Sequence, residues 1–273
     1  MIKTVLPMLW SILKGLVYVC LGADRFAGLQ GWYWSKKLGR EAYDAPVFLE
    51  LARILSPGDA CLDIGANVGQ YSVNLSQIVG PSGKIWAFEP VPYTRAILRL
   101  VLGYCGIANV RVMSEALSDT SVSTTMVTPV DTWGVPQVGL SYIGEACVSK
   151  KEVTHTIAMR PSDEVLMGNA DFFVSGGFVK IDVEGHELYV LRGARSFLTR
   201  CRPVLLIEID PDMSRRAGVD VQDTIQFLTD MGYTMGYFNL GVWYPHLTEV
   251  ASGGDVLVSE RTVKLQSLTV CWA

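Results

Sequence analysis

The chain has 273 residues, of which 49% are hydrophobic and 18% charged, and a formal net charge of −4. This composition supplies a large buried core and excludes disorder as the main state, because disordered chains are poor in apolar residues. The acidic balance disfavours a nucleic-acid partner, since proteins that bind phosphate backbones carry excess Lys and Arg. Six cysteines without a CxxC pair disfavour a zinc site and favour buried thiols in a reducing, cytoplasmic compartment.

The start of the chain, Met1–Phe26, predicts an apolar helix, because its polar residues recur every three or four positions and form one narrow stripe. We expect residues 1–22 to lie in a membrane interface, to pack on the domain or to contact a second copy. A membrane span is disfavoured because Lys14 would be buried near its centre. Residues 28–43 read as an irregular connection, so that residues 1–43 precede a larger domain over 44–273.

From Asp59 onward, short apolar runs alternate with helical stretches, which is typical of βαβ units around a parallel sheet. Ala60–Ile64 predicts a first strand, and a helix should follow from Gln70 or Tyr71 to Ile78. Between them lies a turn in which Gly65 and Gly69 allow the backbone to approach a ligand closely. The second predicted strand, Ile85–Phe88, ends at Glu89.

The glycine loop and the acid together indicate a nucleoside cofactor. An acid at the end of a second strand suits two hydrogen bonds to the hydroxyls of a ribose. The loop reads G-x-N-x-G instead of the dinucleotide pattern G-x-G-x-x-G, and no Walker lysine follows it. A cofactor without a pyrophosphate therefore fits best, and S-adenosylmethionine is the obvious member of that class.

A third strand is predicted at Asn109–Met113, and its carboxyl end should lie beside the base of the cofactor. Glu115 or Asp119 is then placed to accept a hydrogen bond from an adenine amino group, with Ala116 and Leu117 against the ring. Alternatively, both acids are solvated turn residues.

A cluster of acids follows the next apolar strand, Phe178–Ile181. Helix capping accounts for one acid, but Asp182, Glu184 and Glu187 all lie within six residues. A further buried strand, Pro203–Ile207, leads to Glu208. Acids from two adjacent strands at one sheet edge predict an acceptor site, with a base for a hydroxyl and room for a divalent ion between Asp182 and Glu208.

The long insertion, about residues 120–176, contains Thr- and Val-rich segments that read as short strands, and an excursion beside a site is usually a lid or specificity element. Trp133 and Tyr142 either stack on a sugar ring or fill the core beneath the insertion. Downstream, a helix at Asp223–Met231 and strands at Tyr233–Phe238 and Asp255–Ser259 complete a doubly wound, mostly parallel sheet of seven strands.

Five segments resemble the FkbM-type S-adenosylmethionine-dependent methyltransferases. They are LDIGANVGQYS (62–72), AFEP (87–90), NVRVMSEALSD (109–119), FVKIDVEGHELYVLRGA (178–194) and RPVLLIEI (202–209). The resemblance implies a Rossmann-like class I methyltransferase fold and O-methylation of hydroxyls on sugars, glycans or natural products. One departure is IAMRPSD (157–163), where such proteins usually carry a Leu-Asp-Asp-like segment.

The resemblance also implies the roles of individual residues. The residues that it places at the cofactor are Asp63, Gly65, Asn67, Gly69, Ser72 and Glu89. Those that it places nearest the transferring methyl are Asp182, Glu184 and His186. Two rival functions are a catalytically inactive scaffold that binds S-adenosylmethionine and an NAD-dependent dehydrogenase, and the glycine spacing disfavours the dehydrogenase.

Overall fold

A computed structural model describes residues 2–38, 45–145, 151–168, 177–239, 242–245, 249–251, 255–258, 261–264 and 269–272. The helices are α1 (Ile2–Leu38), α2 (Ala45–Ile54), α3 (Gln70–Val79), α4 (Pro92–Tyr104), α5 (Ser162–Met167), α6 (Glu187–Gly193), α7 (Arg195–Cys201), α8 (Pro211–Arg216) and α9 (Val221–Asp230). The strands are β1 (Ala60–Ile64), β2 (Lys84–Phe88), β3 (Val110–Met113), β4 (Ala116–Ser118), β5 (Val122–Pro129), β6 (Tyr142–Ile143), β7 (Glu152–Pro161), β8 (Phe178–Ile181), β9 (Val204–Ile207), β10 (Thr234–Asn239), β11 (Val242–Pro245), β12 (Glu249–Ala251), β13 (Asp255–Val258), β14 (Arg261–Lys264) and β15 (Thr269–Trp272).

The main sheet has the strand order β11-β10-β15-β9-β8-β1-β2-β3. Its strands β3, β2, β1, β8 and β9 are parallel, whereas β15, β10 and β11 pair with their neighbours in antiparallel fashion. The parallel strands are apolar on both faces because helices cover both, and Leu62, Ile85, Phe178 and Leu205 are fully buried. The α/β fold with a parallel sheet is thus confirmed.

Two details of the predicted sheet are wrong. The described part of the main sheet holds eight strands, not seven, because β11 pairs with β10. The segment predicted as its last strand, β13, lies instead in a separate sheet with β12 and β14, and β15 takes its place beside β9. The predicted helix from Leu188 is also two short helices, α6 and α7, with Ala194 between them at φ −101° and ψ 13°.

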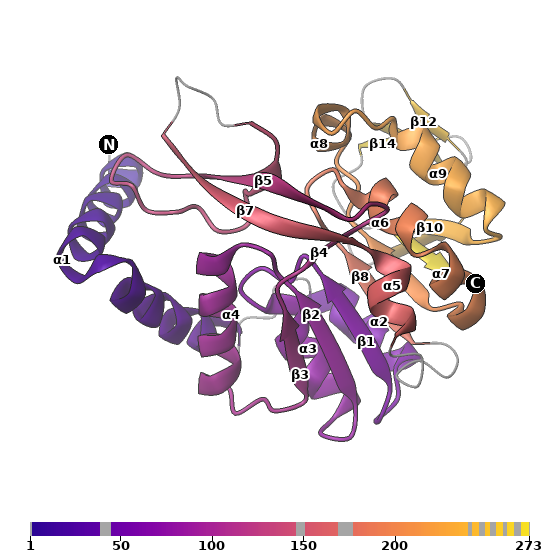
Figure 1. Cartoon of the computed structure of the whole chain (residues 1–273), viewed down its shortest axis with the longest axis horizontal. Helices are drawn as coiled ribbons and strands as arrows, with labels where there is room; N and C mark the ends of the chain where they lie inside the picture. Colours follow the sequence, from indigo (N-terminus) through magenta and orange to yellow (C-terminus); the bar gives the residue numbers. More distant parts are fainter. Residues whose placement is uncertain are drawn as a thin grey trace.

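The insertion contributes β5, β6 and β7 to a second sheet in the order β4-β7-β5-β6, which confirms the predicted short strands; β4, just before the insertion, was not predicted. In Figure 1 this sheet crosses above β1, β2 and β3, between α1 at one end and α6 at the other. Residues 146–150 and 169–176 of the predicted insertion lie outside the described residues.

The first helix is longer than predicted. It continues to Leu38 instead of giving way to an irregular connection at residue 28, although Gly22 interrupts it with non-helical backbone angles. Its second half packs on α4, where the Tyr93 hydroxyl donates a hydrogen bond to Gln30 Oε1 at 2.6 Å. Residues 39–43 of the predicted connection lie outside the described residues.

The first half of α1 rests on the insertion. Lys14 Nζ lies 4.0 Å from an oxygen of Asp131, and Gly15 faces the ring of Trp133. Leu13, Leu16 and Val19 are exposed on the same half. Within the described residues, no helix has the length and apolarity needed to cross a membrane.

A pair of glycine substitutions tests this contact. We expect Gly28→Ala to raise the thermal unfolding midpoint by about 2–4 °C, because Ala stabilises a helix interior by roughly 1 kcal/mol over Gly and nothing lies within 4 Å of the new Cβ. Gly15→Ala should instead lower the midpoint, since its Cβ would lie 2.1 Å from Trp133 Cγ. An increase in both variants would contradict the packing of α1 on the insertion.

Candidate active site

A cavity lies at the carboxyl ends of β1, β2 and β8, where open α/β sheets bind their ligands. It is walled by the loops after β1, β2, β3 and β8 and by the insertion. The predicted residues among its walls are Gly65, Asn67, Glu89, Glu115, Ala116, Asp182, Glu184 and His186. The predicted site residues that are not among its walls are Asp63, Gly69, Ser72 and Glu208.

The loop after β1 requires glycine at its first position. Gly65 has φ +78°, and a Cβ there would lie 1.7 Å from the carbonyl oxygen of Asp182, so any side chain would separate β1 from β8. Asn67 also adopts a left-handed conformation, with φ 49°, and its buried Oδ1 has no hydrogen-bond partner in the described residues. This strained loop therefore presents an unsatisfied polar atom at the cavity.

Glu89 is buried and anchored to the same loop. Its Oε2 accepts a hydrogen bond from the Asn67 backbone N–H, and its Oε1 accepts one from Val91 N–H, both at 2.9 Å. Burial raises the pKa of Glu89 to about 7, although these two hydrogen bonds oppose the rise. The carboxylate is thus held rigidly at the cavity wall, at the end of β2.

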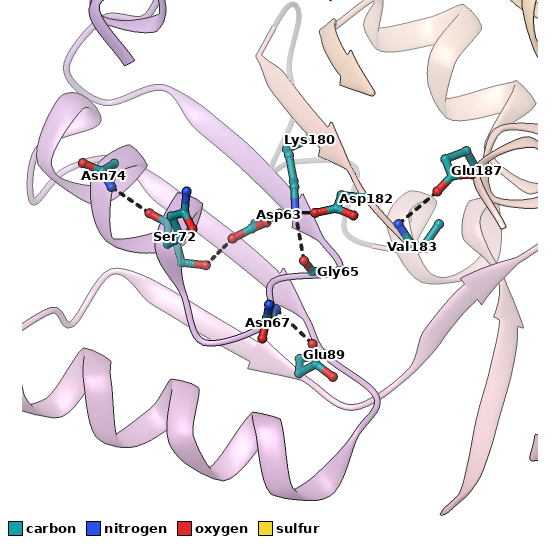
Figure 2. A network of polar contacts seen from close by, with 11 residues as sticks. Asp63, Gly65, Asn67, Ser72, Asn74, Glu89, Lys180, Asp182, Val183 and Glu187 are labelled. Carbon is teal, nitrogen blue, oxygen red and sulfur yellow. Dashed lines mark hydrogen bonds and ion pairs between the residues drawn. The ribbon is translucent and has the colours of Figure 1, made fainter. Parts of the chain in front are cut away.

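Lys180, on β8, is the centre of a polar network that joins β1, β8 and the loop after β1 (Figure 2). Its Nζ lies 2.9 Å from Asp182 Oδ2 and 3.7 Å from Asp63 Oδ1, and it donates a hydrogen bond of 2.9 Å to the Gly65 carbonyl. Ser72 Oγ donates to Asp63 Oδ2 at 2.6 Å. Asp63 and Ser72 therefore belong to the network that holds the loop, while Asp182 extends from the network to the cavity.

The charge of Lys180 is stabilised by this network. Burial opposes that charge, but Asp182 and Asp63 outweigh burial and raise the pKa of Lys180. Burial also raises the pKa of Asp63, and Lys180 and Ser72 oppose that rise. Lys180 was not predicted as a site residue, because a single lysine inside an apolar run gives no sign of its partner on another strand.

The acids after β8 have different roles. The pKa of Glu184 is raised to about 8, mainly by burial and then by the neighbouring acids Asp182 and Glu208. Its backbone is in the left-handed region, with φ 54°. Glu187 faces inward: its Oε1 accepts hydrogen bonds from Val183 N–H and Gly185 N–H at 3.1 Å each, and it fixes the loop. Glu184 is therefore an acid of the cavity wall, whereas Glu187 is structural.

His186 is also held in a fixed position. Its Nε2 lies 3.0 Å from Ser118 Oγ, and its ring stacks on Tyr189 with the centroids 4.4 Å apart. Burial lowers the pKa of His186 to about 4, so the imidazole is neutral at pH 7.

The predicted divalent ion between Asp182 and Glu208 gains no support from the geometry. No group of three or more His, Cys, Asp or Glu side chains in the described ranges is arranged to hold a metal. Glu208 acts on the cavity through its charge, which contributes to the pKa shifts of Glu184 and Lys180.

Glu187 gives the stability a testable pH dependence. Burial raises its pKa from 4.5 to about 7, so between these values the folded protein retains a proton that the unfolded chain has released. The free energy of unfolding should therefore fall as the pH rises from 5 to 8. We expect a smaller fall in Glu187→Gln, which keeps an acceptor oxygen for the loop and removes the ionisation. Urea unfolding at both pH values measures this, and an equal fall in both proteins would refute it.

Comparison with known proteins identifies the family. The model of the methyltransferase FkbM domain matches residues 63–235, which include most of the cavity, and no curated protein matches the chain. The chain is similar to the solved structure of methyltransferase FkbM from Methylobacillus flagellatus KT, with 18% identity and a TM-score of 0.48 over 80% of this chain and 44% of that one. It thus spans less than half the length of that protein.

Two further solved structures are similar to the chain. A SAM-dependent O-methyltransferase from Thermotoga maritima has 12% identity and a TM-score of 0.43 over 84% of this chain and 64% of that one. Fibrillarin from Aeropyrum pernix, in complex with natively bound S-adenosyl-L-methionine, has 17% identity and a TM-score of 0.39 over 80% of this chain and 67% of that one. Because the family model covers more than half of the chain, this protein belongs to the FkbM methyltransferase family.

Proposed function

We propose that this protein is an S-adenosylmethionine-dependent methyltransferase and that it methylates a hydroxyl oxygen of a sugar, a glycan or a small natural product. One observation carries the proposal: a single cavity joins the glycine loop and Glu89 on one side to Asp182, Glu184 and His186 on the other. The first side suits the nucleoside part of the cofactor, and the second offers groups that bind and deprotonate a hydroxyl.

The residues of the first side fit S-adenosylmethionine. Glu89 is placed to accept hydrogen bonds from the ribose hydroxyls, and the unpartnered Oδ1 of Asn67 is free to accept another. Glu115 and Ala116 fit the predicted adenine side. When bound, S-adenosylmethionine supplies an electrophilic methyl group: the acceptor oxygen forms a bond to its carbon, the carbon–sulfur bond breaks, and S-adenosylhomocysteine leaves.

Asp182 is the group best suited to take the hydroxyl proton. Its negative charge is stabilised by Lys180 at 2.9 Å, and it reaches the cavity wall. Glu184, with its pKa of about 8, is protonated at neutral pH and is placed to donate a hydrogen bond. The contact between Ser118 and His186 Nε2 fixes the neutral imidazole at the cavity wall, where it is placed to orient the acceptor. In methyl transfer the protein mainly aligns the reacting atoms and accepts the proton.

Cofactor binding involves movement of the insertion. The free volume of the cavity is about 90 Å³, whereas small-molecule sites usually exceed roughly 300 Å³. Gly139, Ser141 and Ile143 line it from above, and a Cβ at Gly139 would lie 2.7 Å from Asn67 Nδ2. Residues 139–143 therefore act as a lid that opens for the cofactor and excludes water when closed.

The proposal is tested by transfer of a labelled methyl group. The protein is incubated with S-adenosylmethionine carrying a ¹³C-methyl group and with a small-molecule extract, and labelled products are identified by mass spectrometry and NMR. We expect a methyl ether on a hydroxyl, which is stable to mild alkali. Labelling only of nitrogen, carbon or carboxylate groups contradicts hydroxyl methylation, and cofactor binding without any labelled product supports the scaffold alternative.

A further inference from the structure

A second cavity adjoins the first at Glu184. It has a volume of about 620 Å³ and lies between the insertion and α8. Glu184 is the one residue among the described walls of both cavities. Side chains alternate along residues 140–143, since Ser141 and Ile143 line the first cavity whereas Leu140 and Tyr142 line the second. The second cavity is thus an approach to the site of methyl transfer.

The volume and lining of this cavity fit a small polar acceptor. Its size lies within the roughly 300–1,000 Å³ of ligand pockets. Apolar contact comes from Pro129, Val130 and Leu140, and Tyr142 adds an aromatic ring. A mixture of apolar surface, an aromatic ring and a few charged groups is typical of sites for polar ring compounds.

Two cations line the cavity without a carboxylate partner. Lys151 precedes β7 and Arg216 ends α8, and neither forms an ion pair within the described residues. Lys151 Nζ lies 3.5 Å from the Thr132 carbonyl, and Arg216 Nη1 lies 3.8 Å from Met213 Sδ. By contrast the neighbouring Arg215, outside the cavity wall, pairs with Asp212 at 2.7 Å.

Two acids, Glu152 and Glu184, also line the cavity and offset these charges only in part. Glu152 accepts a hydrogen bond of 3.1 Å from the Tyr142 hydroxyl. Glu184 is protonated at neutral pH because burial and neighbouring acids raise its pKa to about 8. Two positive groups from different elements therefore face a ligand-sized space that opens toward the acids after β8.

We propose that the second cavity binds the hydroxyl acceptor and that this acceptor carries an anionic group, a carboxylate or a phosphate, which Lys151 and Arg216 hold. This inference rests on the proposed function and adds to it the charge of the substrate and two residues that select it. Arg binds carboxylates and phosphates through paired N–H donors, and Lys binds them as a point charge. The acceptor is then held by its anion at the cations, while its hydroxyl reaches past Glu184 toward Asp182.

The experiment compares three sugars that share a ring and most hydroxyls. Glucose, glucuronate and glucose 6-phosphate are titrated into the protein saturated with S-adenosylhomocysteine, and binding is followed by saturation-transfer NMR. We expect at least one of the two anionic sugars to bind about tenfold or more tightly than glucose. Tighter binding of glucuronate indicates a carboxylate, and tighter binding of glucose 6-phosphate indicates a phosphate. In the double variant Lys151→Gln/Arg216→Gln the anionic sugar should bind no more tightly than glucose. Arg215→Gln, which removes a charge one residue away, should keep the tighter binding of the anionic sugar.

Equal or absent binding of the three sugars overturns the inference, and so does an advantage that survives in the double variant. The proposed function is judged separately by the product of the labelled-methyl experiment. A neutral methyl ether leaves the hydroxyl methylation intact and removes the anionic acceptor. A labelled methyl group on the carboxylate of an anionic sugar contradicts hydroxyl methylation but leaves the anionic acceptor intact.

Discussion

Asp182→Asn is expected to lower methyl transfer about a hundredfold or more, the usual scale for loss of a general base, while S-adenosylmethionine affinity stays within about threefold. The amide keeps the shape and hydrogen-bonding capacity of the side chain but removes its charge and basicity. Lys180 retains Asp63 and the Gly65 carbonyl as partners, so the loop that faces the cofactor should keep its structure. Single-turnover transfer and calorimetry measure the two quantities.

Glu208→Gln is the matched control. Glu208 follows the neighbouring strand β9 and was a predicted catalytic acid, but it does not line the cavity. We expect its amide to change transfer by less than about threefold, because its charge is only one of several contributions to the pKa shifts of Glu184 and Lys180. Full turnover in Asp182→Asn would show that Asp182 only pairs with Lys180, and the base would then have to be sought elsewhere in the cavity.

Lys180→Met is expected to lower the free energy of unfolding by about 3–5 kcal/mol, the cost of breaking a buried ion pair from one side. Met keeps the length and apolar stem of Lys180, but it leaves the fully buried Asp63 without its cation and frees the Gly65 carbonyl. Denaturant unfolding at pH 7 measures the loss.

A double variant separates the charge effect from lost packing. In Lys180→Met/Asp63→Asn the uncompensated charge is removed as well, so part of the stability should return. Asp63→Asn retains an oxygen that accepts the Ser72 hydroxyl. A loss below about 1 kcal/mol in Lys180→Met, or no recovery in the double variant, would contradict the role of Lys180 as the cation of this network.

Much of the fold follows from local sequence patterns. The predicted strand Ala60–Ile64 coincides with β1, and the predicted second, third, fourth and fifth strands match β2, β3, β8 and β9 to within one or two residues. Buried parallel strands are short apolar runs, and each of these except β3, which Ser114 follows, is followed by a glycine or an acid. Because the carboxyl ends of parallel strands meet at one sheet edge, Glu89 and Asp182 were predicted to lie at that edge, and both line the cavity.

Features that depend on distant contacts were not predictable. The segment from Gly28 to Tyr43 was predicted to be an irregular connection, but α1 continues to Leu38 because it packs on α4, and a Cβ at Gly31 would lie 2.6 Å from Leu100 Cβ. Asp255–Ser259 was predicted to be a strand of the main sheet, but nothing in the local sequence indicated that β13 lies in a separate sheet. The second cavity likewise depends on α8 lying beside the insertion, which no local pattern encodes.

Calorimetric titration of the wild type and Glu89→Ala with S-adenosylmethionine measures most directly whether Glu89 holds the cofactor. We expect the variant to lose about 2 kcal/mol of binding free energy, roughly thirtyfold in Kd, because a charge-assisted contact to the ribose is removed. Thermal unfolding of both proteins checks that the variant is folded, since Glu89 also accepts hydrogen bonds from Asn67 and Val91. Unchanged affinity in folded Glu89→Ala, or binding of NAD to the wild type as tight as that of S-adenosylmethionine, would contradict the account.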